Sequence, residues 1–175
     1  TPILSHIGRA VSDEQVQERG KWTFYKGFHK TLELYHLDRL LSDGEVKEKA
    51  QRAGRVILVE GCSDVAKLVE AGIENCLATF GADLSEAQMH KLGLVRAVLS
   101  VCEAVVMFDR DQAGQKSSEA ATERLSEAGW QVTPFDWSAT LGQRHGQSVG
   151  IPELINDPCD FSTQQLQWLK EQRKI

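Results

Sequence analysis

Acidic side chains follow two apolar segments, at the points where predicted strands would end. Glu60 comes directly after Val56–Val59, and Asp109 and Asp111 follow Ala104–Phe108. Short apolar runs without polar alternation are typical of strands that are buried on both faces of a parallel sheet. Parallel strands end at one edge of the sheet, where open α/β proteins bind their ligands. If the two strands are neighbours, these three carboxylates converge there.

Three converging carboxylates predict a site for a hard divalent cation. Oxygen ligands of this kind suit Mg²⁺ or Mn²⁺. Such cations neutralise charge on a transferred phosphoryl group and position the nucleophile and leaving group. An Asp after a strand also serves as a turn former or helix cap, and Asp111 is well placed to cap the next helix. The presence of both acidic elements in this order favours the metal site.

The chain from residue 56 alternates strands and helices, which indicates a mostly parallel four-stranded sheet with flanking helices. The pattern predicts strands at 56–59, 75–79, 104–108 and 130–135, and helices at 63–71, 85–92, 94–102 and 114–128. Ser85 and Gln88 have the spacing of a capping box. Residues 136–151 read as a loop, and Ser162 or Thr163 begins a last helix.

Residues 1–55 have a different character and predict a small α+β lobe. Short β-like pieces precede two helices, at about 32–41 and 44–52. This lobe holds ten Lys/Arg against eight Asp/Glu, whereas residues 56–175 hold ten against seventeen. The split fits contact with a polyanion on one side and cation binding on the other, although charge also fluctuates along any chain. We therefore expect three parts, at 1–55, 56–137 and 138–175.

The composition is that of an ordinary globular chain. It has 175 residues, of which 41% are hydrophobic and 26% charged. No apolar run is long enough to cross a bilayer, and we expect no signal peptide. The first residue is Thr1, which suggests a fragment of a longer chain. The four cysteines lie far apart without a CxxC pair, so we expect reduced thiols in a cytoplasmic protein and no zinc ribbon.

Two segments resemble the Toprim domain of DnaG-type bacterial and phage DNA primases over about residues 55–135. They read "VILVEGCSDVAKLVEAGIENCLATFGADLSEAQ" and "VVMFDRDQAGQKSSEAA". The shared features are an EGxxD segment, an ATxG turn followed by an SxxQ helix start, and DxDxAGxK. Topoisomerases, OLD-type nucleases and small ribosomal-RNA maturation nucleases share the acid pattern. A topoisomerase would need a tyrosine nucleophile, and it is disfavoured because the two tyrosines, Tyr25 and Tyr35, both lie in the lobe of residues 1–55.

The resemblance implies that Glu60, Asp109 and Asp111 are catalytic and hold Mg²⁺ or Mn²⁺. Primases carry a further D-P-x or D-P-D element, and here "NDPCD" offers Asp157 or Asp160 as an additional ligand. Asp157 matches the Asp-Pro position, whereas Asp160 lies one residue too late for a strict D-P-D. Asp64, within EGxxD, is equally a helix cap or a metal ligand.

A weaker resemblance to the basic lobe of primases extends upstream, through "GRAV", Lys21, "FYKG" and "LELYHL". It implies that Arg9, Lys21 and Lys26 contact template or nucleotide phosphates. Lys116 lies at the start of the helix after the acids, where a lysine and backbone N–H groups could meet phosphate.

The function implied is that of a DNA primase catalytic core, a nucleotidyltransferase that makes RNA primers. Its partners would be single-stranded DNA, ribonucleoside triphosphates, a replicative helicase and a zinc-binding domain outside this sequence, with no membrane. Two alternatives stay open. A Toprim nuclease would use the same acids with water as nucleophile, and a non-catalytic nucleic-acid-binding module would carry a degenerate site.

Overall fold

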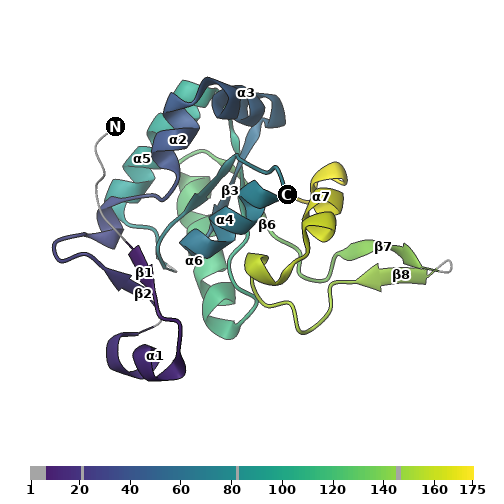
Figure 1. Ribbon diagram of the computed structural model, residues 1–175. Helices are drawn as coiled ribbons and strands as arrows, with labels where there is room; N and C mark the ends of the chain where they lie inside the picture. The colour runs from purple at the N-terminus through teal and green to yellow at the C-terminus, as the bar shows by residue number, and fades with distance from the viewer. Residues whose placement is uncertain (1–6, 21, 82, 145–146) are drawn as a thin grey trace. The chain divides into compact units, whose positions relative to one another are not determined.

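The computed structural model describes residues 7–20, 22–81, 83–144 and 147–175 (Figure 1). The chain divides into two compact units, residues 1–30 and 31–175. Each unit has its own secondary structure. The first of the predicted β-like pieces, at residues 2–7, lies outside the described residues except for Ile7, which begins β1.

The first unit is a two-stranded sheet with one helix. Strands β1 (Ile7–Arg9) and β2 (Trp22–Phe24) pair antiparallel. Between them lies α1 (Asp13–Arg19), a helix that was not predicted. Ser12 caps this helix by accepting a hydrogen bond from the backbone N–H of Gln15. Polar residues occupy most of α1, so it lacks the apolar stripe by which amphipathic helices are found.

The second unit is built on a four-stranded parallel sheet, as expected. Its order is β4 (Cys76–Ala78), β3 (Arg55–Val59), β5 (Glu103–Val106) and β6 (Gln131–Pro134). Strands β3 and β5 are direct neighbours, with Leu58 opposite Val106. Their carboxyl ends therefore lie side by side at one edge of the sheet.

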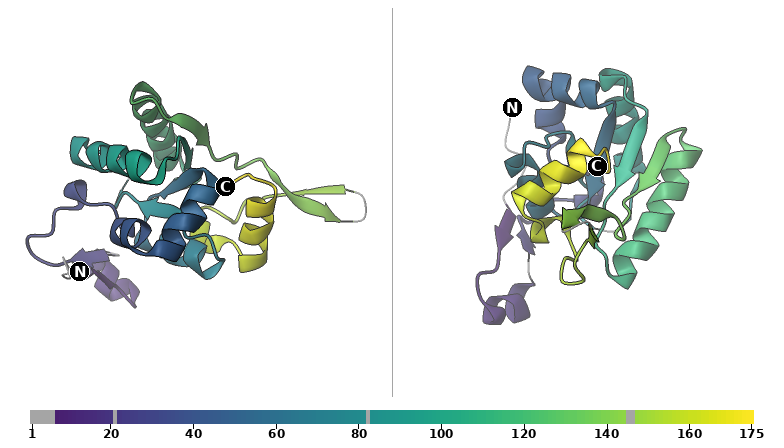
Figure 2. Two further views of the ribbon diagram at one scale, coloured as in Figure 1. Left: turned by 90° about the horizontal axis from the view of Figure 1, so that it is seen from above. Right: turned by 90° about the vertical axis from the view of Figure 1, so that its right-hand side faces the viewer.

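Helices cover both faces of this sheet (Figures 1 and 2). Alternate residues of β3 enter two separate cores, because successive side chains of a strand point to opposite faces. One core contains residues of α2 (Leu37–Ser42), α3 (Gly44–Ala53), α5 (Glu86–Leu99) and α6 (Gln112–Glu127). The other contains residues of α4 (Cys62–Glu70) and α7 (Thr163–Glu171). Within the described residues, no helix is long and apolar enough to cross a membrane.

Two helix predictions need correction. The segments expected at 85–92 and 94–102 form one helix, α5, which passes through Gly93 and buries Leu92, Val95 and Leu99 along one face. The helix expected at 32–41 is instead a 3-10 turn, Lys30–Leu32, followed by the short α2. The backbone of Tyr35 exchanges hydrogen bonds with Ala78 of β4, so this part of the chain is extended.

The predicted loop at 136–151 contains a hairpin. Strands β7 (Thr140–Arg144) and β8 (Gln147–Gly150) pair antiparallel. Their sequences, TLGQR and QSVG, hold one aliphatic side chain each, so the period-two pattern that marks a strand is weak. Pairing of the two backbones, rather than side-chain pattern, defines these strands.

The docking of α7 is testable by truncating its buried face. Leu169 is fully buried, and we expect Leu169→Ala to lower the free energy of unfolding by about 2–5 kcal/mol. The matched control is Leu154→Ala, since Leu154 is 77% exposed and its truncation should change stability by less than about 0.5 kcal/mol. Urea denaturation measures both. Equal losses would contradict this packing of α7.

Candidate metal centre

Glu60 lies at the point where β3 ends and connects the two central strands. Its side chain is partly buried, and its Oε1 accepts a hydrogen bond from the backbone N–H of Asp109 at 3.2 Å. Asp109 follows β5 after the buried pair Met107–Phe108. The register of β3 and β5 thus brings the two acidic positions into direct contact.

The segment after Asp109 turns at once into α6. Asp111 is the N-cap of this helix, and its Oδ1 accepts a hydrogen bond from the backbone N–H of Gly114 at 2.7 Å. A Cβ atom at Gly114 would lie 2.2 Å from the carbonyl oxygen of Asp109. Glycine is therefore required here by the close approach of α6 to the acidic loop, and the capping role expected for Asp111 is present.

Carboxylates crowd around Asp109. The pKa of Asp109 is raised to about 7, first by burial and then by the negative charges of Glu60, Asp64, Asp157 and Asp111, in that order of importance. Burial also raises the pKa of Glu60, as do the charges of Asp111 and Asp64, while the N–H of Asp109 opposes the shift. A bound cation would relieve this repulsion.

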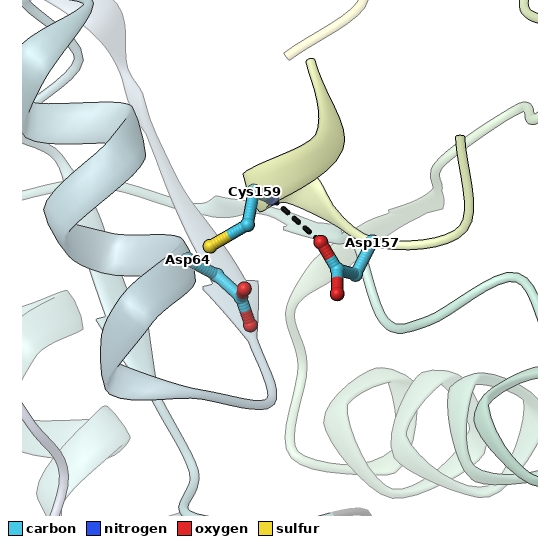
Figure 3. A group of neighbouring side chains, drawn as sticks. All are labelled: Asp64, Asp157 and Cys159. Carbon is cyan, nitrogen blue, oxygen red and sulfur yellow. Dashed lines mark hydrogen bonds between the residues drawn. The ribbon is translucent and has the colours of Figure 1, made fainter. Parts of the chain in front are cut away.

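A second group lies beside the first and includes a thiol (Figure 3). One ligand atom each of Asp64, Asp157 and Cys159 lies within 4.8 Å of the others. Asp64 comes from the first turn of α4, and its Oδ2 accepts the N–H of Gly61 at 2.8 Å. Asp157 caps the 3-10 turn Pro158–Asp160, and its Oδ1 accepts the N–H of Cys159 at 2.8 Å.

Arg110 connects the acidic loop to the segment that carries Asp157. Its backbone N–H donates to the carbonyl of Asn156 at 2.7 Å, and its Nη1 donates to the carbonyl of Pro152 at 3.0 Å. The carboxylate of Asp160 accepts the N–H of Asn156 at 2.8 Å. Asp160 therefore orders the backbone of this segment, while Asp157 lies close enough to raise the pKa of Asp109.

The structure brings together the acids singled out from the sequence, namely Glu60, Asp109, Asp111 and Asp157, together with Asp64, for which a helix cap and a metal ligand were equally expected. Their binding of a metal remains a prediction. Sequence reasoning gave no metal role to any cysteine, because no pair has ligand spacing. The available signal was positional, since Cys159 lies two residues after Asp157, where a D-P-D element has its second acid.

Of the basic residues predicted to contact phosphate, those within the described residues are all exposed to solvent. Lys116 is exposed on α6, two residues after Gly114. Arg9 and Lys26 are exposed in the first unit, and the guanidinium of Arg9 lies 5.5 Å from the ring centre of Trp22. Lys21 lies outside the described residues. Phosphate contact by these four residues remains a prediction.

Comparison with known proteins finds a Toprim domain and relatives among the DNA primases. The profile of the Toprim domain matches residues 54–136. A DNA primase of Pseudomonas aeruginosa is 38% identical over 98 residues, which are 56% of this chain and 13% of that protein. A DNA primase of Chlamydia trachomatis is 31% identical over 120 residues, 67% of this chain and 19% of the relative. The matches therefore span a small part of each relative.

Solved primase structures share the fold. The zinc-binding and RNA polymerase domains of Aquifex aeolicus primase align with a TM-score of 0.65 and 22% identity, covering 98% of this chain and 36% of that one. A DNA primase domain from Pseudomonas aeruginosa aligns with a TM-score of 0.56 and 28% identity, covering 76% and 39%. A DnaG primase catalytic domain bound to single-stranded DNA aligns at 0.53 and 22%, with the same coverage of 76% and 39%.

Because α6 approaches the backbone of Asp109 closely at Gly114, we expect a methyl group added there to destabilise the protein, whereas one added at Gly93 should not. Gly114→Ala should lower the free energy of unfolding by about 1–3 kcal/mol, because the backbone of Asp109 has to move. Gly93→Ala is the control, since nothing lies within 4 Å of a Cβ added in the middle of α5. That change should stabilise the helix by about 0.5–1 kcal/mol. Chemical denaturation that found both changes neutral would contradict this geometry.

The crowding around Asp109 predicts a pH dependence. With its pKa raised to about 7, folded Asp109 keeps a proton that the unfolded chain loses near pH 4, so stability falls between these values and levels off above about 7. Asp109→Asn does not titrate. Relative to the wild type, its free energy of unfolding should rise by on the order of 1 kcal/mol from pH about 4.5 to 8, a figure reduced for partial exposure.

Urea denaturation in EDTA at several pH values measures this difference. A stability difference between Asp109→Asn and the wild type that stays constant with pH would contradict the crowding. The reverse slope would indicate that Asp109 is stabilised, not strained, as a carboxylate.

Proposed function

Because residues 54–136 form a Toprim domain and the chain is related to the DnaG-type DNA primases, we propose that it is part of a primase catalytic core. The proposed reaction is DNA-directed RNA primer synthesis by metal-dependent nucleotidyl transfer. The 3′-hydroxyl of a bound nucleotide attacks the α-phosphate of the next ribonucleoside triphosphate, and pyrophosphate leaves. The observation that carries this proposal is the gathering of carboxylates around Asp109, at the adjoining ends of β3 and β5.

The donor set of this edge fits a hard divalent cation. Glu60, Asp109, Asp111 and Asp157 would hold Mg²⁺ or Mn²⁺, which when bound supplies positive charge to a phosphoryl group in transfer. Glu60 holds the acidic loop in place through the N–H of Asp109. Asp109, with a pKa of about 7, gives up its proton when it takes part in binding, so affinity should increase with pH.

Nucleic acid and nucleotides are polyanions, which cationic side chains of either unit can bind. We assign phosphate contacts to Arg9, Lys21, Lys26 and Lys116, which are cationic. Support for a DNA template comes from the related DnaG catalytic domain described as bound to single-stranded DNA. A helicase and a zinc-binding domain are further partners in this proposal, and the aligned Aquifex aeolicus structure contains a zinc-binding domain.

Primer synthesis on single-stranded DNA, with labelled ribonucleoside triphosphates and Mn²⁺, tests the proposal. Asp109→Ala should lower the yield of short RNA by at least about 100-fold, because it removes a central ligand of the cation. The control is Glu119→Ala, since Glu119 is an exposed acid on α6 and its loss should leave the yield unchanged.

The products distinguish this function from its rivals. Template cut in an Asp109-dependent way without nucleotides would establish a nuclease and overturn the primase assignment. DNA binding that persists in EDTA, with neither synthesis nor cleavage, would indicate a non-catalytic binding module.

A further inference from the structure

We propose that Cys159 is a metal ligand, and that Asp64, Asp157 and Cys159 form a mixed site that prefers a thiophilic divalent cation to Mg²⁺. We call these three residues the thiol site. Zn²⁺, Cd²⁺ and Co²⁺ are the cations expected to bind there. The inference deepens the proposed function, because the thiol site adjoins the carboxylates assigned to catalysis.

The geometry of the three side chains supports a shared ligand. Their ligand atoms all lie within 4.8 Å of one another, and they converge from two elements, α4 and the 3-10 turn Pro158–Asp160 (Figure 3). Zn–S and Zn–O bonds of about 2.0–2.3 Å put two ligands of one tetrahedral ion roughly 3.5 Å apart. Movements of about 1 Å, within the range of side-chain adjustment, would therefore close the site.

Both carboxylates are held in position by backbone groups. Asp64 accepts the N–H of Gly61 through Oδ2, and Asp157 accepts the N–H groups of Cys159 and Asp160 through Oδ1. These bonds fix the start of α4 and the 3-10 turn around the two carboxyl groups. The backbone of Cys159 is thereby tied to the carboxylate of Asp157.

The thiol itself is partly buried against acids. It hydrogen-bonds to the side chains of Ser63 and Asp64. When a divalent cation binds, the Sγ proton would leave to solvent as the metal–sulfur bond forms. The negative charges that surround the thiol then favour the bound metal.

Ligand chemistry sets the preference. Thiolate sulfur favours Zn²⁺ and similar cations, whereas Mg²⁺ takes oxygen ligands and keeps several of its waters. The carboxylates Glu60, Asp109 and Asp111 offer oxygen alone. The two groups would therefore differ in the cation they select. Because both would use the carboxylate of Asp157, a thiophilic cation at the thiol site would compete for this ligand with a cation held by Glu60, Asp109 and Asp111.

Titration of the protein with Co²⁺ tests the thiol site without an activity assay. A sulfur-to-Co²⁺ charge-transfer absorption should appear in the wild type and be absent in Cys159→Ser, which keeps a similar shape. Two control substitutions should retain the band. Cys62→Ser removes another partly buried thiol, and Cys102→Ser removes an exposed one that precedes β5, at the opposite end of the strand from the acids.

Competition measures the selectivity. Cd²⁺ should displace Co²⁺ at far lower concentration than Mg²⁺, and Cys159→Ser should weaken Cd²⁺ binding by at least about tenfold while leaving Mg²⁺ binding within about threefold. Circular dichroism confirms that each variant is folded. A Co²⁺ band that persists in Cys159→Ser would overturn the proposal.

The outcomes separate this inference from the proposed function. Asp109-dependent Mn²⁺ binding and primer synthesis without any sulfur–Co²⁺ band would overturn the thiol site and leave the primase proposal intact. A Cys159-dependent band in a protein that makes no primer would support the thiol site and count against the primase.

Discussion

The candidate site depends on the parallel register between β3 and β5. Leu58 lies opposite Val106, and both strands are buried, so the polar residues that follow them emerge together. The hydrogen bond from the N–H of Asp109 to Glu60 closes this junction beyond the last paired residues. A shift of one residue would move Glu60 by about 3.3 Å and exchange the sheet face of every side chain in β3. Because residues on both faces of β3 enter cores, such a shift would expose apolar side chains, and the register is strongly specified.

The same edge concentrates negative charge at a cost to stability. Asp109 is partly buried, and like charges surround it, from Glu60 after β3, from the first turn of α4, from the turn that contains Asp157 and from the N-cap of α6. The sheet core, with β3 fully buried, is what allows this repulsion to persist in the folded state. Such concentrations of shifted carboxyl groups are typical of functional sites, where a ligand rather than the protein supplies the compensating charge.

The sequence predicted the parts of this arrangement that depend on local pattern. Apolar runs predicted β3 and β5, and the Ser85–Gln88 capping box predicted the start of α5. The position of the acids, directly after two strands of one parallel sheet, predicted that these acids would lie close together. The break predicted between the helices at 85–92 and 94–102, which falls at Gly93, is absent from α5. The reason is that the buried face of α5 continues on both sides of Gly93 and outweighs the modest helix penalty of one glycine.

What the sequence could not predict depends on contacts between distant segments. Tyr35 is extended because it pairs with Ala78, more than forty residues later. Cys159 was given no metal role, because its neighbourhood with Asp64 arises only after the chain has left β6 and formed the β7–β8 hairpin. No spacing rule within the sequence relates α4 to the turn at Pro158.

The segment that carries Asp157 and Cys159 is held beside the Asp109–Asp111 loop by contacts on two sides. On the core side, the rings of Phe135, Trp137 and Phe161 pack together, with centroids 4.9–6.2 Å apart. On the site side, Arg110 bonds to the carbonyls of Asn156 and Pro152 from within the Asp109–Asp111 loop itself. Because the aromatic group flanks the turn and Arg110 joins it to the acids, Asp157 and Cys159 cannot shift without disturbing that loop. The two acidic segments therefore form a single unit, in which the identity of the residue at 159 bears on the cation that the whole edge accepts.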